Sequence, residues 1–427
     1  MEEKRNVPKL RFPGFTDSWE QRRLGDEFEF LRNNTLSRAE LSDSEGSCFD
    51  VHYGDVLIKF GSVIDLEKMA LPRVASDKMA SRLTCDKLRN GDVVVADTAE
   101  DEAAGKCVEL RKIGDATVYP GLHTMPLRPL RRYAPGFLGH YLNSSSFRDQ
   151  LKPLMQGIKV ISVSRAVIAG ASLIVPAIDE QDAIAKTFAK LDSLIALHQR
   201  ELDHVKELKK GLLQKMFPKE GTNVPELRFP GFTDPWEQRR LGELMDITSV
   251  KRVHQDDWSS EGIRFLRARD LVAFSNGEEI DEPLFISEEL YEEYSSLSGK
   301  AVENDLLVTG VGTIGVPWRV PSSEPIYFKD GNIIWFKNMN VIDGLFFYYS
   351  FTSSSIQDFI RKSAGSGTVG TFTIDTGKKT PIQLPSIDEQ AQIGGFFQRL
   401  DSLIALHQRE LDHVKELKKG LLQQMFV

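Results

Sequence analysis

The sequence predicts an α/β (α+β) fold in which two mixed globular domains are joined by a pair of long antiparallel coiled-coil helices. Two internal repeats support this prediction. Residues 191–214 recur letter for letter at 400–423, and residues 7–26 recur at 224–243 with three differences in 20 positions. The segments between these repeats scarcely resemble each other. The chain is therefore one module used twice, in which a constant frame surrounds two different inserts.

The order of the repeats divides the chain into four expected parts. These are a first globular domain with its front motif at 1–177, a long helix at 178–217, a second domain with its front motif at 218–386 and a second long helix at 387–427. Each insert offers an apolar strand, a helix and a glycine-bearing turn in the same order. These elements are expected at 90–96, 137–154 and 155–157, and again at 304–309, 345–362 and 365–370. We expect two divergent copies of one mixed fold.

The long helices carry a heptad seam, since apolar residues alternate in steps of three and four with no proline between 179 and 216. His198 and Lys209 interrupt it. We interpret His198 and its copy His407 as packing residues, with a metal site or a pH switch as the alternative. A second apolar row widens the helix face, and we expect partner subunits to cover it at Leu194, Leu197, Leu403 and Leu406.

The link between the helices predicts how they run. About 37 helical residues span roughly 55 Å at 1.5 Å each. Only a short polar link follows the first helix before the second front motif, so the second insert is expected at the far end of that helix. A second helix that packs on the first must then run back toward the first insert. We therefore expect antiparallel helices and an internal pseudo-twofold axis.

Composition is that of an ordinary soluble globular protein, with 41% hydrophobic and 27% charged residues. No apolar run is long enough for a transmembrane helix, the polar start does not resemble a signal peptide, and three unpaired-looking cysteines suit a reducing cytoplasm. The net charge of −8 does not favour nucleic acid by itself. However, eight carboxylates are concentrated in 276–293, and basic groups cluster locally elsewhere, where a polyanion can dock.

A G-x-G-x-x-G pattern at 310–315 follows an expected strand, but prolines follow it, so no helix can open there to hold a dinucleotide. We interpret it as a glycine-rich turn that exposes backbone N–H groups, which a DNA phosphate can approach. We find no nucleophile constellation, metal-ligand spacing or methyltransferase motif. The chain is therefore expected to have no catalytic activity and no metal site of its own.

Several motifs together carry a family resemblance. Trp19 and Trp236 precede Arg-Leu-Gly, Pro176 and Pro385 precede Asp-Glu-Gln, both long helices end in KKGLLQ-x-MF, and the second insert contains NDLLVTGVGTIG. With these motifs in this order over essentially its whole length, the chain resembles the specificity (S) subunits of type I restriction–modification systems. The first insert departs from the usual glycine turn and reads VVADTAEDEAAGKC.

The resemblance implies that each insert is a target recognition domain that reads one half of an asymmetric bipartite site in double-stranded DNA. The helices would set the spacer and dock two methyltransferase (M) subunits, and restriction (R) subunits would join for cleavage. S-adenosylmethionine, ATP and Mg would belong to these partners, which form an adenine methyltransferase and an ATP-dependent endonuclease, in the bacterial or archaeal cytoplasm. The alternative is a coiled-coil adaptor protein that does not bind DNA.

DNA-contacting residues are expected on loops beside glycines, where the backbone can approach a phosphate. The candidates in the first insert are Gln156, Gly157, Lys159 and Arg165. Those in the second insert are Arg267, Arg269, Gly312, Thr313, Ser366 and Thr368. Arg267 and Arg269 alternate on an expected strand end and could fork onto a guanine. The alternative for this pair is an ion pair with the acidic run at 278–293.

Overall fold

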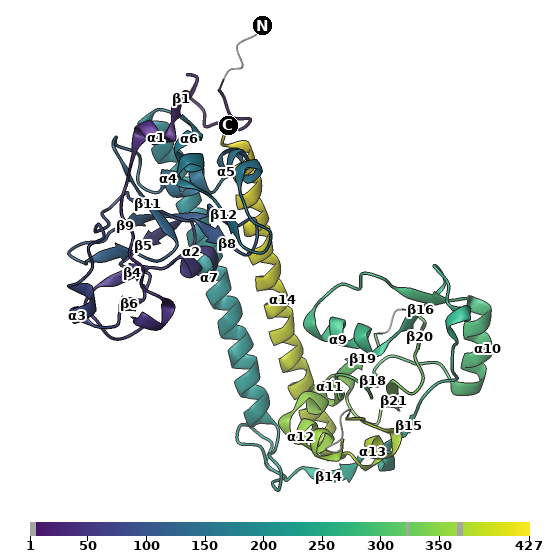
Figure 1. The fold of residues 1–427 in the computed structure, drawn as a ribbon. Coiled ribbons are helices and arrows are strands. Elements are labelled where there is room, and N and C mark those ends of the chain that lie inside the picture. Colours follow the sequence, from purple (N-terminus) through teal and green to yellow (C-terminus); the bar gives the residue numbers. More distant parts are fainter. Residues whose placement is uncertain (1–5, 322–323, 365–369) are drawn as a thin grey trace. The chain divides into compact units, whose positions relative to one another are not determined.

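The computed structural model describes residues 6–321, 324–364 and 370–427. The chain forms two compact units. The first unit contains Met1–Gln199 and Gln408–Val427, and the second contains Arg200–His407. Each unit therefore holds one insert and one part of each long helix (Figure 1). Among the helices of the described residues, none is both long and apolar enough to cross a membrane.

Two helices are far longer than the others: α7 (Ile178–Met216) and α14 (Ile387–Gln424). In the first unit, Lys418 donates to Asp192 at 2.5 Å, and His198 lies 3.5 Å from Glu410. As the residue number rises along α7, it falls along the facing part of α14. The helices therefore run antiparallel in the first unit, as predicted.

The second unit repeats this arrangement with the helices exchanged. Lys209 of α7 donates to Asp401 of α14 at 2.5 Å, and His407 lies 3.7 Å from Glu201. The residues that interrupt the apolar seam are thus polar pairing positions between the two helices. The predicted class, two mixed domains joined by long antiparallel helices, is confirmed.

Two main sheets form the insert of the first unit. The larger has the order β2-β11-β7-β9-β5, which are Phe28–Phe30, Thr124–Pro129, Val93–Ala96, Cys107–Arg111 and Val63–Asp65. The smaller has the order β10-β4-β6-β3, which are Val118–Pro120, Phe49–Val51, Arg73–Val74 and Leu41–Ser42. Short pairs are formed by β1 (Glu20–Arg23) with β13 (Ser172–Val175) and by β8 (Thr98–Ala99) with β12 (Ile161–Ser162).

The insert of the second unit has the same plan. Its sheets have the orders β15-β21-β18-β19 (Asp246–Thr248, Ile333–Lys337, Leu306–Thr309, Pro317–Arg319) and β17-β16-β20 (Leu284–Ile286, Ile263–Leu266, Ile326–Phe328). A short pair joins β14 (Glu237–Arg240) to β22 (Pro381–Leu384). The orders β2-β11-β7-β9 and β15-β21-β18-β19 correspond, and both are antiparallel. The parallel pair β4–β10 likewise corresponds to β16–β20. The inserts are divergent copies of one fold, as predicted.

Short helices complete both units. Those of the first are α1 (Leu24–Glu27), α2 (Tyr53–Ile58), α3 (Asp77–Ala80), α4 (Phe137–Leu142), α5 (Ser145–Leu151) and α6 (Arg165–Gly170). Those of the second are α8 (Leu241–Leu244), α9 (Ala268–Asn276), α10 (Glu288–Ser298), α11 (Gly344–Thr352), α12 (Ser354–Ser363) and α13 (Ile374–Lys379). Short 3₁₀ turns occur at Arg38–Glu40, Lys152–Leu154 and Gln255–Asp257.

The single helices expected at 137–154 and 345–362 are each two helices. The chain breaks at Ser144 and Ser353, whose backbones are extended (ψ 155° and 154°). Serine suits the residue that precedes a helix, where its short polar side chain can satisfy local backbone groups. Neither break contains a proline or glycine, which is why the sequence predicted one helix at each place.

Candidate nucleic-acid interface

The repeated motifs hold each insert on the long helices through a buried ion pair. In the first unit, Arg11 of the front motif donates twice to Glu180 of α7, both at 2.7 Å. In the second unit, Arg228 makes the same two 2.7 Å bonds to Glu389 of α14. Both glutamate side chains are at most 1% exposed. Such two-point bonds fix orientation as well as distance.

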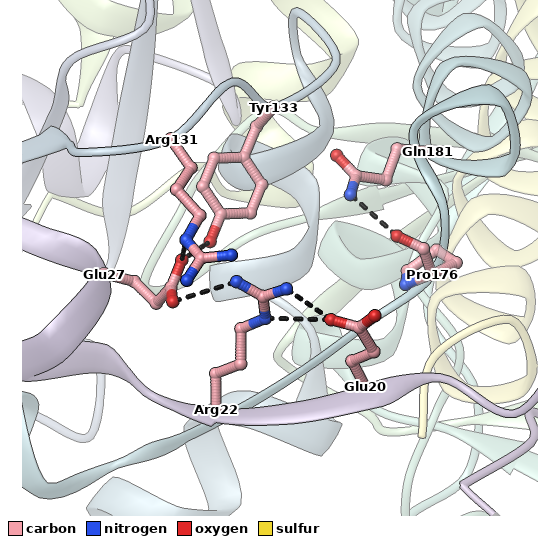
Figure 2. A network of polar contacts seen from close by, with 7 residues as sticks. All are labelled: Glu20, Arg22, Glu27, Arg131, Tyr133, Pro176 and Gln181. Atoms are coloured by element: carbon pink, nitrogen blue, oxygen red, sulfur yellow. Dashed lines mark hydrogen bonds and ion pairs between the residues drawn. The ribbon is translucent and has the colours of Figure 1, made fainter.

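The glutamine of each Asp-Glu-Gln motif ties the first turn of the long helix to the proline that precedes it. Gln181 donates to the backbone oxygen of Pro176 at 2.8 Å (Figure 2), and Gln390 donates to that of Pro385 at 2.9 Å. Each also accepts at 3.1 Å from a backbone N–H of the insert, before α4 or before α11. The motif therefore joins insert, proline turn and helix in one place.

The first unit adds a polar network to its frame. Figure 2 shows Arg22 between Glu20 and Glu27, with Arg131 and Tyr133 also reaching Glu27. Glu27 is buried. The burial of Tyr133 itself and, as the second cause, the negative charge of Glu27 raise the pKa of the Tyr133 hydroxyl. Glu20, Arg22, Arg131 and Tyr133 line a cavity of about 370 Å³. Because the carboxylates pair with Arg22 and Arg131, we interpret the network as structural and not as a phosphate site.

The glycine-rich turn of the second unit connects β18 to β19. Gly315 N–H donates to the backbone oxygen of Thr309 at 2.8 Å, and the Thr309 hydroxyl bonds the backbone of Thr313. Gly312 has a left-handed φ of +71°, and Gly312 and Thr313 are exposed. A strand follows this turn and not a helix, as expected, so the helix that a dinucleotide-binding G-x-G-x-x-G motif needs does not begin here.

This turn borders a concave surface that encloses a volume of about 560 Å³. Phe372 N–H donates to the Gly310 oxygen at 2.9 Å, and a Cβ at Gly310 would lie 2.8 Å from the Phe372 oxygen. Close backbone approach thus requires glycine here. The polar lining residues are Ser249, Thr371, Thr373 and Asp375. Two further candidates, Ser366 and Thr368, lie outside the described residues.

The first unit brings the equivalent segments together. Val163 N–H donates to the Asp97 oxygen at 2.9 Å, as Phe372 does to Gly310. Asp97 N–H in turn bonds the His123 oxygen at 3.1 Å, just as Gly310 N–H bonds the Asn332 oxygen at 2.7 Å. In both units, therefore, three segments lie side by side. They are the end of the central strand (β7 or β18), the loop before β11 or β21, and the segment before the last short helix (α6 or α13).

Three predicted residues of the first insert share one hairpin. Gln156 and Ser162 exchange backbone hydrogen bonds of 3.0 and 2.8 Å, and Gly157 and Lys159 lie in the exposed loop between them. Arg165 begins α6, is exposed, and has its guanidinium 4.3 Å from the centre of the Phe30 ring. Asp97 and His123 were not among the predicted residues. Their place depends on strand order, for which the sequence carries no local signal.

Arg267 and Arg269 differ from the expectation. β16 ends at Leu266 and α9 begins at Ala268, so the two arginines do not alternate along a strand. Arg267 precedes the helix and forms a two-point pair with Asp270 at 3.0 and 2.9 Å, which leaves it 15% exposed. Arg269 is 62% exposed and its guanidinium lies 3.9 Å from Glu282. The capping arrangement ends the strand, because Asp270 also accepts from the Arg267 N–H.

The leucines predicted as a partner surface are exposed on the long helices. Leu194 and Leu197 lie in the first unit, and Leu403 and Leu406 lie at the same places in the second. Their exposed fractions range from 37% to 43%. Apolar residues that recur on one helix face and remain this exposed are typical of a protein interface.

Comparisons with known proteins agree with this architecture. Residues 233–416 match the family model described as type I restriction modification DNA specificity domain. The MjaVIII specificity subunit of Methanocaldococcus jannaschii is 24% identical over 64% of this chain and 65% of its own length, so the match spans less than two thirds of that protein. The putative MjaX specificity subunit of the same organism is 21% identical over 98% of this chain and 95% of its own.

A solved structure has the same fold. The S subunit of a type I system from M. genitalium matches with a TM-score of 0.59 and 15% identity, and the match covers 99% of each chain. The resemblance predicted from the repeated motifs is confirmed.

Proposed function

We propose that this chain, a member of the type I restriction–modification specificity-subunit family, is the sequence-reading subunit of its complex. Each insert is a target recognition domain that binds one half of an asymmetric bipartite site in double-stranded DNA. The observation that carries the proposal is the convergence of three equivalent segments in each unit by matching backbone bonds, from Asp97 in the first unit and from Gly310 in the second. The same backbone position thus presents different side chains to a ligand.

The chemistry of the second surface suits DNA. The turn around Gly312 and Thr313 is exposed and glycine-rich, so a phosphate can approach its backbone closely. Thr371 lines the adjacent concave surface, where its hydroxyl can donate to or accept from base edges, whereas the Ser249 hydroxyl already bonds the backbone of Ile333 and Gly331. Arg269 offers an exposed cation within the same insert. Such contacts separate into phosphate positioning and base reading.

The long helices take the remaining roles. We assign α7 and α14 as the ruler that sets the unread spacer, and their exposed leucines as the docking surface for two methyltransferase subunits, one on each unit. Restriction subunits join this assembly for cleavage. S-adenosylmethionine, ATP and Mg belong to the partners, and the complex acts on DNA in the bacterial or archaeal cytoplasm. An adaptor that does not bind DNA is not favoured, because the differing surfaces would then have no ligand.

The test exploits the identical frames. Residues 27–177 are replaced by a second copy of 244–386, so that both units carry the same insert. Two unlike inserts imply an asymmetric site, whereas two like inserts related by a twofold axis imply inverted identical halves. We expect methylome sequencing to show two inverted copies of the half-site read by the second unit. An altered second half, or an unchanged motif, contradicts independent reading.

A further inference from the structure

The hairpin of the first insert ends in a tight, fixed turn. Gln156 and Ser162 are joined by two backbone hydrogen bonds, and Ser162 also belongs to β12, which pairs with β8. Gly157 has φ +118°, and a Cβ there would lie 1.8 Å from the backbone oxygen of Val160. Only glycine allows this reversal. The buried Val163 anchors the chain directly after the hairpin.

The apex of this hairpin is apolar. Ile158 is 98% exposed, Val160 is 54% exposed, and the exposed Lys159 stands between them. A single exposed apolar residue is ordinary on a protein surface. Here, however, a β-branched side chain with few rotamers stands at the end of a constrained turn, beside two residues predicted to contact DNA. The hairpin therefore presents one exposed, conformationally restricted apolar side chain, Ile158, with the charged Lys159 next to it.

The position of the apex favours DNA over a protein as its ligand. A partner that docks on both units would use the repeated frame, whereas Ile158 belongs to the insert that occurs only once. The apex is also small: a stable protein interface buries about 800 Å² on each partner, far more than Ile158 and Val160 offer. A gap between two base pairs accepts a single aliphatic side chain.

We propose that Ile158 is an apolar wedge that enters a groove of the first unit's half-site and partly unstacks one base-pair step, while Lys159 binds a neighbouring phosphate. This inference rests on the proposed DNA-reading function. Aliphatic wedges of this kind kink the duplex by roughly 20–90° at the step they enter. Pyrimidine–purine steps unstack most easily. The half-site read by the first unit is therefore expected to contain a TA or CA/TG step opposite Ile158.

The experiment uses the full chain in its native complex and duplexes that carry the methylated motif. A 2-aminopurine base placed in turn beside each step of the half-site reports unstacking by its fluorescence. The wild type is expected to raise fluorescence at one step. Ile158→Ala removes that rise and weakens binding roughly 10-fold, because the bent duplex loses the apolar contact that offsets the cost of unstacking. Ile158→Phe retains both. Leu130→Ala, a change at another exposed apolar residue of this unit, leaves both unaltered.

The outcomes separate the wedge from the proposed function. If the wild type binds its motif but no step brightens, and Ile158→Ala binds equally well, the wedge is wrong and DNA reading stands. If the wild type shows no sequence-dependent binding, the proposed function and the wedge fail together. If Ile158→Ala keeps DNA binding but loses a co-purifying protein, the apex is a protein contact and the wedge is overturned.

Discussion

The two units place different chemistry at one position of the same fold. In the second unit, the seven-residue turn between β18 and β19 contains three glycines and no charge. In the first unit, the corresponding connection at 97–106 carries four carboxylates. Arg148 braces it by donating to the backbone oxygen of Ala104 at 2.9 Å, and Lys106 donates to that of Leu57 at 2.6 Å. A glycine turn suits a phosphate, whereas carboxylates suit the amino groups of cytosine.

The frame shows the opposite behaviour, with one informative exception. Asp401 accepts at 2.6 Å from Tyr349 of α11, but the equivalent Asp192 faces His140 of α4 at 3.7 Å. Within the described part of the chain, neither imidazole nitrogen of His140 has a hydrogen-bond partner. Identical helices therefore meet unequal inserts, and the first unit has the poorer contact. Four predictions test how far the frames are equivalent and the inserts are not.

The largest effect is expected at the buried ion pairs. Arg228→Ala should destabilise the second unit, and Arg11→Ala the first, by about 3–5 kcal/mol each, because a buried glutamate loses its partner. Hydrogen-exchange mass spectrometry locates the loss to one unit. Lys362→Ala, which removes an exposed pair with Glu220, serves as the control and should change little. Unequal losses in the two units would show that the frames are not energetically equivalent.

The frame was predictable from the sequence because its residues act through fixed partners. Near-identical front motifs and helices require near-identical surroundings, so the antiparallel pairing and the shared fold followed from the repeats. The glycine-bearing turn expected at 155–157 was predictable too, because it depends on neighbouring residues, but the hairpin that Gln156 and Ser162 close was not predicted. The convergence of Asp97 with His123 was not, because it depends on which strands pair. Arg267 was misplaced because Asp270, three residues later, starts a helix.

The next effect concerns partner binding. Leu194→Ser with Leu197→Ser should remove one methyltransferase subunit from the complex, and Leu403→Ser with Leu406→Ser should remove the other, because each pair lies on the long helices of one unit. Native mass spectrometry counts the subunits. The matched control replaces Leu130 and Leu297, which are exposed on the inserts. If a variant that carries all four leucine-to-serine changes still keeps both methyltransferase subunits, these leucines are not the docking surface.

A smaller effect is expected from pH. Burial lowers the pKa of His140 to about 4, and Asp192 and Lys418 are the charged groups beside it. Between about pH 6.5 and 4 the unfolded histidine binds a proton that the folded one does not, so the first unit should lose roughly 1–3 kcal/mol as pH falls.

His140→Phe should remove that part of the pH dependence from the first unit and leave the second unit unchanged. Urea unfolding followed unit by unit between pH 7 and 4 gives the comparison. The effect of His140 is read from the difference in stability between the variant and the wild type at each pH. This comparison is needed because burial raises the pKa of Glu109 to about 7, so Glu109 changes the stability of the first unit with pH in the opposite direction. An identical pH slope in both proteins would show that His140 does not titrate as its burial requires.

The smallest effect separates Arg269 from Arg267. Arg267 is already bound to Asp270, so Arg267→Ala should reduce the stability of the second unit and leave discrimination between DNA sequences intact. Arg269 is exposed, and we expect it to bind a phosphate. Arg269→Ala should therefore weaken binding equally on cognate and single-mismatch duplexes, by roughly 2- to 10-fold. The slope of log affinity against log salt concentration should become smaller by about 1. Fluorescence anisotropy over a range of salt concentrations measures both quantities. A loss confined to one mismatch would instead make Arg269 a base reader, and an unchanged affinity would leave it with only its ion-pair partners Asp270 and Glu282.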